Sequence, residues 1–258
     1  MITVITPTVT GGLFYLSELV PTIERQTPPH EFILIDNASR DGTTNYMGFH
    51  AATLKINAVK MNFSQSNNYG ASIAKGDYLL FLNNDTKLED NVLDKMLNVF
   101  SLDAKIAIVG VQIRLMKHPR KVHHAGVMFT EKYEPYELGL SQPFGIPELP
   151  GNDQRTWSVR EVPAVTAACM MVRKDVFNEV GGFDEEYNNG WEDVDLNLKV
   201  REKGYKVYYT GETFVHHHHF GSRDRGRFNF ETENRARYED KWMKTGKAKE
   251  ILKGFRES

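Results

Sequence analysis

Polar side chains in this sequence stand where a buried strand would end. Residues 78–82 form an apolar run of strand length, and Asn83, Asn84 and Asp85 follow it directly. Such a run is typical of a buried parallel strand, and ligands of open α/β sheets bind just beyond the carboxyl ends of the strands. Asp85 would then face a crevice, where a carboxylate can hold a hard divalent cation on a phosphate. A simple turn before a helix near Glu89 explains this segment equally well.

Two more polar clusters follow earlier apolar runs. Thr6, Pro7 and Thr8 come after the first run, and Asp36 and Asn37 come after the second. Every strand of a parallel sheet ends at the same edge, so the three clusters would lie along one cleft. Hydroxyls, amides and two carboxylates in one cleft suit a nucleotide with a metal better than an apolar ligand.

Another cluster is acidic and lies at the start of a predicted helix. Glu192, Asp193 and Asp195 follow Trp191 within a few residues. Acidic side chains in a first turn interact favourably with the helix dipole by about 0.3–1 kcal/mol, so capping is one explanation. Three carboxylates exceed what capping needs, and a catalytic role is the other explanation. Only residues three or four apart share a helical face, so at most one or two of them would face a site.

Four consecutive histidines, residues 216–219, follow a short predicted strand. In an extended chain only every second imidazole points to one side. The run could be a solvated surface, but a single metal ligand among the four is favoured, because a carboxylate site needs a partner. Residues 222–227 then supply arginines, which suit phosphate and a solvated loop equally.

These side chains need a scaffold, and the order of the predicted elements indicates one. The first half alternates strands at residues 2–6, 31–36, 54–61 and 78–82 with helices at residues 13–26 and 68–75. This alternation predicts an α/β fold with a mostly parallel sheet and helices on both faces. No G-x-G-x-x-G follows the first strand, which argues against a dinucleotide-binding dehydrogenase.

The second half is less regular. Its predicted elements are helices at residues 90–102, 192–203 and 235–253, strands at 106–113, 162–172 and 206–209, and a turn at 181–184. Residues 133–153 are rich in proline and glycine and predict a long surface loop, and such loops are usually lids or specificity elements. The absence of an internal repeat or a low-complexity linker favours a single domain.

The composition narrows the class of protein. The 258 residues include 32 Lys and Arg against 34 Asp and Glu, a formal charge of −2, so nothing indicates bulk binding to nucleic acid. The single cysteine, Cys169, excludes an internal disulfide, fits a reducing compartment and lies in an apolar run that predicts burial. The sequence shows no secretory leader and no apolar run long enough to span a bilayer. We therefore expect a cytoplasmic protein, or a soluble catalytic piece of a longer one.

Taken in order, the motifs resemble those of family 2 glycosyltransferases, which have the Rossmann-like GT-A fold. The resemblance runs from about residue 2 to residue 242. The matching segments are residues 4–8, 32–42, 63–78, 82–86, 166–169, 181–184 and 192–196. No single motif decides the matter, but together and in register they are specific.

The resemblance implies a nucleotide-diphosphate sugar donor, of UDP or dTDP type, and a glycan acceptor. The donor-binding residues that it implies are Thr6, Pro7, Thr8, Asp36, Asn37, Asn67, Asn68, Asn83 and Asn84. Asp193 would be the general base of an inverting transfer, Glu192 would position the acceptor, and Trp191 would stack on the acceptor sugar. The resemblance leaves peripheral membrane association open and implies no nucleic acid.

The resemblance also implies a metal site, with Asp85 and His217 as ligands. The first position of the metal motif is Asn83, where most of the family has Asp, so this position brings no charge. Spacing from Gly211 selects His217, and His216 or His218 remain alternatives. A mixed carboxylate–imidazole site accepts Mn²⁺ better than an all-oxygen site built for Mg²⁺ does, so we expect Mn²⁺ rather than Mg²⁺.

Two rival functions share parts of this pattern. A sugar-nucleotide pyrophosphorylase would need a basic, glycine-rich loop after the first strand, and Gly11 and Gly12 alone do not form one. A catalytically inactive carbohydrate-binding module could retain the fold, but Asp85, Asp193 and His217 together argue against it. We expect one domain over residues 1–258, with a nucleotide-sugar half at residues 1–113 and an acceptor half at residues 114–258.

Overall fold

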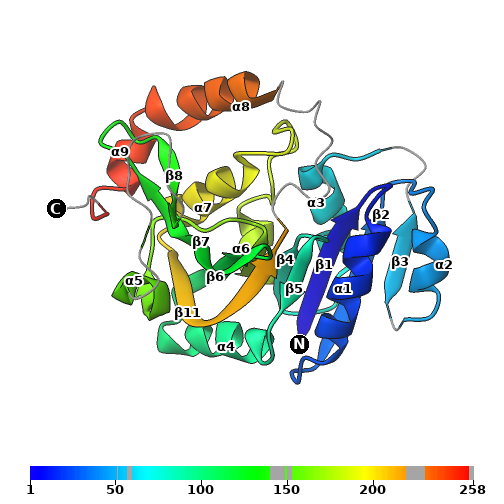
Figure 1. Ribbon diagram of the computed structural model, residues 1–258. Helices are drawn as coiled ribbons and strands as arrows, with labels where there is room; N and C mark the ends of the chain where they lie inside the picture. Colours follow the sequence, from blue (N-terminus) through cyan, green and yellow to red (C-terminus); the bar gives the residue numbers. More distant parts are fainter. Residues whose placement is uncertain (51, 57–59, 140–148, 150–152, 219–229, 256–258) are drawn as a thin grey trace.

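The computed structural model describes residues 1–50, 52–56, 60–139, 149, 153–218 and 230–255. Within these residues, eleven strands form one sheet. The main path of the sheet runs in the order β3-β2-β1-β4-β10-β6-β11-β5, and β7, β8 and β9 pair beside it. Helices lie on both sides of the sheet (Figure 1).

The N-terminal half follows the predicted alternation of strands and helices. Its elements are β1 (Ile2–Thr8), α1 (Leu13–Glu24), β2 (His30–Asp36), α2 (Thr43–Met47), β3 (Thr53–Ile56), α3 (Phe63–Ile73) and β4 (Tyr78–Leu82). Strands β3, β2, β1 and β4 are parallel neighbours in that order, and Thr8 of β1 pairs with Asp36 of β2. Three polar clusters of the sequence therefore come to one edge of the sheet.

The C-terminal half adds mostly antiparallel strands. Its elements up to the sixth helix are β5 (Thr86–Leu88), α4 (Val92–Val99), a 3-10 turn (Phe100–Leu102), β6 (Ile106–Leu115), β7 (His118–Phe129), β8 (Pro135–Gly139), α5 (Gln154–Trp157), β9 (Val159–Glu161), β10 (Cys169–Arg173) and α6 (Lys174–Glu179). The remaining elements are α7 (Glu192–Glu202), β11 (Lys206–His217), α8 (Glu231–Tyr238), a π-helical segment (Glu239–Met243) and α9 (Lys247–Ile251). Strand β10 runs antiparallel between β4 and β6, and β11 is parallel to β6.

Alternate residues of β4 enter two different hydrophobic cores. Leu80 and Leu82 pack in the cluster that holds α1 and α4, whereas Leu79 and Phe81 pack in the cluster that holds α3, α6 and α7. Side chains of a strand point alternately to the two faces of its sheet, so each cluster covers one face. The apolar run without polar alternation is explained by burial on both faces, and the α/β fold with helices on both faces is confirmed.

One predicted strand is wrong over most of its length. Residues 162–172 were expected to form a strand, but only Cys169–Arg173 does. Pro163 cannot donate a ladder hydrogen bond. The side chain of Asn197 instead binds both the N–H and the C=O of Val165, at 3.2 and 2.9 Å. A side-chain amide thus replaces the sheet as the partner of this backbone.

Other differences concern element lengths. Strand β7 was not predicted. Its first four residues, 118–121, are exposed and are either polar or proline, so the sequence does not show a strand pattern until residue 122. Strand β11 continues eight residues beyond the predicted 206–209, to His217. The predicted helix at 235–253 is interrupted by the π-helical segment and a turn. Residues 135–139 of the predicted loop form β8, and residues 140–148 and 150–152 lie outside the described part of the chain.

Candidate active site

A cleft of about 320 Å³ opens above the carboxyl ends of β1, β2 and β4. The first turn of α7 also lines it. The lining residues that the sequence predicted are Pro7, Thr8, Asn37, Asn83, Asn84, Glu192 and Asp193. Residues from four distant parts of the chain thus share one cavity, as the strand-end argument requires.

The strand-end side of the cleft is tied together by hydrogen bonds. The Asn84 amide donates to the Thr8 hydroxyl at 2.9 Å, and the Asn37 amide donates to the Ser66 hydroxyl at 3.0 Å. Gly12 allows the β1–α1 turn to approach this wall, since a Cβ at Gly12 would lie 2.1 Å from Oγ1 of Thr8. The wall presents hydroxyl and amide groups in fixed positions.

Behind this wall lie Thr6 and Asp36, which are fully buried. One Asp36 carboxylate oxygen accepts a hydrogen bond from the backbone N–H of Ser39 at 3.0 Å. The other oxygen, like the Thr6 hydroxyl, is buried without a hydrogen-bond partner among the described residues. Neither Thr6 nor Asp36 lines the cleft. The Asp36 oxygen is an acceptor to which a nucleoside could donate.

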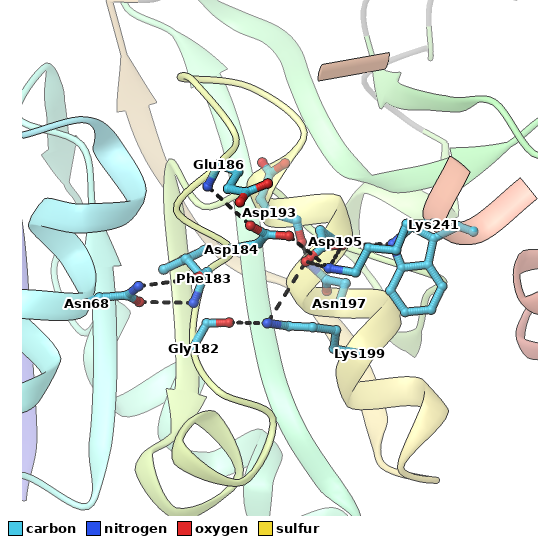
Figure 2. Close-up of polar contacts among 11 residues, drawn as sticks. Asn68, Gly182, Phe183, Asp184, Glu186, Asp193, Asp195, Asn197, Lys199 and Lys241 are labelled. Carbon is cyan, nitrogen blue, oxygen red and sulfur yellow. Dashed lines mark hydrogen bonds and ion pairs between the residues drawn. The ribbon is translucent and has the colours of Figure 1, made fainter. Parts of the chain in front are cut away.

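Asn67 and Asn68 are in α3 and are not part of the cleft lining. The Asn67 amide donates to the carbonyl of Phe63 at 2.9 Å. The Asn68 side chain donates to the carbonyl and accepts from the N–H of Phe183, both at 2.9 Å (Figure 2). It also donates to the carboxylate of Glu185. Asn68 therefore fixes the loop after α6, which is a different role from the predicted donor contact.

Beside the cleft, Asp85 and His217 form a close pair. Nε2 of His217 lies 3.0 Å from Oδ1 of Asp85, and both side chains are buried. The neighbouring imidazoles point elsewhere, with His216 3.4 Å from Glu89 and His218 2.6 Å from Glu18. His219 lies outside the described residues. Strand alternation thus brings one of the three described histidines of this run to Asp85.

The Asp85–His217 pair fits a metal that is shared with a phosphorylated ligand. Among the described residues, no group of three or more His, Cys, Asp or Glu side chains could hold a metal on its own. One carboxylate oxygen and one imidazole nitrogen supply two ligands, and diphosphate oxygens can supply others. Burial lowers the pKa of nearby His123 to about 4, so this imidazole carries no competing charge at neutral pH.

Asp193 lies at the start of α7 and lines the cleft. Its Oδ2 accepts a hydrogen bond from the N–H of Ala167 at 3.1 Å, and its Oδ1 accepts one from the N–H of Val194 at 2.8 Å. Desolvation raises the pKa of the Asp193 carboxyl, and the charge of Glu137 raises it further. The two backbone hydrogen bonds lower this pKa, but the net shift is upward. A carboxylate with a raised pKa is a stronger base than an ordinary aspartate.

The other two acidic residues of the motif have different surroundings. Glu192 is buried and lines the cleft, where its carboxylate accepts from the N–H of Gly190. Asp195 is fully buried and accepts from the indole N–H of Trp242 at 2.8 Å and from the Lys241 ammonium (Figure 2). Only Glu192 and Asp193 therefore face the cleft, in agreement with the expected limit of one or two.

The structure does not place Trp191 in the cleft. Its indole donates to the Glu231 carboxylate at 2.9 Å, and its ring packs on Tyr238 with a centroid separation of 5.0 Å. The described cleft wall instead includes Asn188 and Asn189. Sequence reasoning missed these two amides, because Asn-Asn-Gly before a helix is typical of an ordinary turn.

Two further expectations concern surfaces. The arginines of residues 222–227 lie outside the described part of the chain. Among the helices that the structure describes, none is both long enough and apolar enough to cross a bilayer.

A cleft at the strand ends, a buried carboxylate–imidazole pair and an acidic helix start thus lie in one α/β fold. The family model "Glycosyl transferase family 2" matches residues 3–181. This chain belongs to glycosyl transferase family 2.

Two relatives with similar sequences are named for O-antigen synthesis. The chain is 34% identical over 170 residues to the O-antigen biosynthesis protein RfbC of Myxococcus xanthus. The aligned region covers 63% of this chain and 12% of RfbC. The chain is 26% identical over 232 residues to the O-antigen chain rhamnosyltransferase WbaN of Salmonella anatum, covering 84% of this chain and 66% of that one. The chain thus spans a small part of RfbC and just under two thirds of WbaN.

Solved structures agree on the fold. The structure of GalNAc-T7 with UDP, GalNAc and Mn²⁺ matches 84% of this chain and 43% of its own, with a TM-score of 0.68 at 17% identity. The mannosyltransferase PcManGT of Pyrobaculum calidifontis, in complex with GDP-Man and Mn²⁺, matches all of this chain and 65% of its own, with a TM-score of 0.60 at 15% identity. The GT-A fold expected from the resemblance is confirmed.

Proposed function

We propose that this chain transfers a sugar from a nucleotide-diphosphate donor, of UDP or dTDP type, to a hydroxyl of a glycan acceptor. The observation that carries the proposal is that Thr8, Asn84 and Asp193 line one and the same cleft. Such a cleft can bind a nucleotide at the strand ends and expose the sugar to a base. The relatives named for O-antigen synthesis support a saccharide acceptor in polysaccharide synthesis.

The transfer would be a single displacement with inversion. Asp193 takes the proton from the acceptor hydroxyl while its oxygen attacks the anomeric carbon, and the bond from that carbon to the diphosphate breaks. The raised pKa of Asp193 favours this proton transfer. Glu192, next to it in the cleft wall, positions the acceptor. Asp36 and Thr8 hold the nucleoside at the opposite end.

Asp85 and His217 would hold a divalent cation, Mn²⁺ in preference to Mg²⁺, against the diphosphate. When bound, the cation supplies positive charge that stabilises the leaving diphosphate. Mn²⁺ in the complexes of GalNAc-T7 and PcManGT supports this choice of metal. The buried single cysteine supports a cytoplasmic location. We further propose that one domain carries both halves, with the donor on residues 1–113 and the acceptor on residues 114–258.

A thermal-shift panel tests the donor. UDP-, dTDP- and GDP-sugars are each added with Mn²⁺, with Mg²⁺ or without metal. A donor at a hundredfold excess over its dissociation constant stabilises by about 2.7 kcal/mol, which corresponds to a midpoint increase of about 5–10 °C for a chain of this size. We expect a UDP- or dTDP-sugar with Mn²⁺ to give the largest increase. No increase with any donor would contradict the proposal.

An activity assay separates an enzyme from a binding module. The stabilising donor is incubated with Mn²⁺, and release of the nucleoside diphosphate is measured. An inactive module would bind the donor without releasing product. A pyrophosphorylase would instead form a nucleoside triphosphate when pyrophosphate is added. The Asp193→Asn variant is the matched control, because it should retain the thermal shift and lose the release.

A further inference from the structure

The segment Glu231–Met243, here called the C-terminal clamp, binds the chain on both sides of the proposed base. It comprises α8 and the π-helical segment, and its side chains contact the first turn of α7 and the loop before it. The family model ends at residue 181, so both the clamp and α7 lie outside the matched region. The contacts of the clamp are therefore features of this chain that the family match does not describe.

The first set of contacts holds the first turn of α7. Asp195, two residues after Asp193, is fully buried. The Lys241 ammonium lies between Asp195 and Asp184, within 3.0 Å of each (Figure 2). Asp195 also accepts from the indole N–H of Trp242 and lies 4.0 Å from the Lys199 ammonium. Burial alone would lower the pKa of Lys241, but the two carboxylates raise it, so the lysine remains charged. Removing Lys241 would leave the buried Asp195 carboxylate with the more distant Lys199 ammonium as its counter-charge among the described residues.

The second set of contacts holds the loop before α7. The buried Asn234 side chain accepts from the N–H of Asn188 at 3.1 Å and donates to the carbonyls of Asn188 and Gly190 at 3.2 and 3.0 Å. In this loop Asn189 has a φ of 52° and Trp191 a φ of 74°. Residues other than glycine rarely adopt positive φ values. Such backbone conformations persist only where the surrounding structure holds them, and they concentrate at functional sites.

We propose that Lys241 and Asn234 are positioning residues for the base, acting through Asp195 and through the Asn188–Gly190 backbone. The inference rests on the proposed function of Asp193 as the base. Asp193 lies between the two held points, and its own bond to the N–H of Ala167 at 3.1 Å fixes it against the cleft. A small shift of the first turn of α7 would move this carboxylate away from the acceptor hydroxyl. Donor binding, at the strand-end wall, would not change.

Lys241→Met tests the clamp, because it removes the charge and keeps the side-chain length. The matched control is Lys244→Met, directly after the clamp, where the lysine pairs with Asp240 and both side chains are about two-thirds exposed. A misplacement of about 1 Å can cost about 10²-fold in rate, so we expect kcat to fall by about 10- to 100-fold with the donor KM unchanged. Lys241→Arg should recover part of the loss, and Lys244→Met should behave as the unaltered protein.

Hydrogen exchange provides a measurement that does not require activity. Amides of residues 192–196 should exchange faster in Lys241→Met than in Lys244→Met, while those of β4 should not change. Should Lys241→Met fail to fold, Asn234→Ser gives the same comparison with a smaller perturbation. Normal kcat and normal exchange in the folded variant would overturn the positioning role alone. Absence of any transfer by the unaltered protein would instead overturn the proposed function.

Discussion

Nε2 of His217 lies 3.0 Å from Oδ1 of Asp85, although 132 residues separate them in the sequence. The pairing of β11 with β5 explains the approach, because His217 stands opposite Thr86, the residue after Asp85. Alternation along β11 then turns His216 to the other side, toward Glu89. The proposed metal site is therefore built by strand register, and its two ligands can be tested separately.

Asp85→Ala should abolish the Mn²⁺-dependent tightening of nucleoside-diphosphate binding, because the carboxylate of the pair is lost. Calorimetry of UDP and dTDP with and without Mn²⁺ measures the effect. Asp90→Ala is the control, since Asp90 is exposed and its carboxylate lies 3.8 Å from Arg25. Unchanged Mn²⁺-dependent affinity in Asp85→Ala would place the metal elsewhere.

His217→Ala should weaken the response to Mn²⁺ more than His216→Ala does. Both residues are on the same strand, but only His217 contacts Asp85, so the pair of variants separates metal binding from a general effect on the strand. A metal titration followed by thermal shift ranks the two. The reverse ranking would assign the ligand to His216 and leave the rest of the cleft unchanged.

The sequence could predict residues whose position follows from a strand end. Thr8, Asn37 and Asn84 meet in one cleft because parallel strands end at one edge, and this needs no knowledge of side-chain packing. Asp193 was predicted by its place at a helix start together with the family resemblance. His217 came from the resemblance alone, since alternation by itself left the choice between neighbours open.

Residues whose surroundings come from distant segments could not be predicted in this way. Trp191 was expected to stack on an acceptor, but its indole donates to Glu231, 40 residues away, and it does not line the cleft. Asn68 was expected to bind the donor, but its amide serves Phe183, which is 115 residues away. A polar motif thus indicates that a side chain needs partners, without indicating whether these are ligands or other parts of the chain.

Gly12→Ala should reduce affinity for the nucleoside diphosphate. Its Cβ would lie 2.1 Å from Oγ1 of Thr8 and 2.8 Å from the Asn84 amide, so the Thr8–Asn84 hydrogen bond must break or the turn must move. Overpacking of this kind typically costs about 1–3 kcal/mol of stability. Gly254→Ala, where a Cβ meets no atom within 4 Å, is the control. Chemical denaturation measures the stability of Gly12→Ala, and calorimetry measures its affinity for the nucleoside diphosphate. Unchanged stability together with unchanged affinity would contradict the prediction.

The pH dependence of transfer should report the environment of Asp193. Desolvation and the charge of Glu137 raise the pKa of this carboxyl. As the solution is acidified, kcat/KM should therefore begin to fall at a higher pH than it would with an ordinary aspartate as the base. Glu137→Gln removes a negative charge near Asp193, which lowers its pKa. The acid limb of the profile should then move to lower pH. An acid limb that does not move in this variant would show that Glu137 does not act on the base.

Asp193→Asn should remove the base while keeping its size and its place in the cleft. General-base catalysis contributes about 10²–10⁴-fold in rate, so transfer should fall by about this range. Donor and metal binding should persist, because their residues are at the strand-end wall and in the Asp85–His217 pair. Calorimetry with the donor and Mn²⁺ is the control for intact binding. Glu192→Gln should cost less if Glu192, as proposed, positions the acceptor and does not take its proton.

The stereochemistry of the product tests the same assignment independently. In a single displacement the acceptor oxygen enters opposite the leaving diphosphate, so the anomeric centre of the transferred sugar must invert. NMR of the product, through the anomeric proton coupling or the one-bond carbon–proton coupling where the sugar requires it, distinguishes the two configurations. A retained configuration, or near-normal turnover in Asp193→Asn, would exclude Asp193 as the base of an inverting transfer, and the positioning role of Lys241 would lose its target with it.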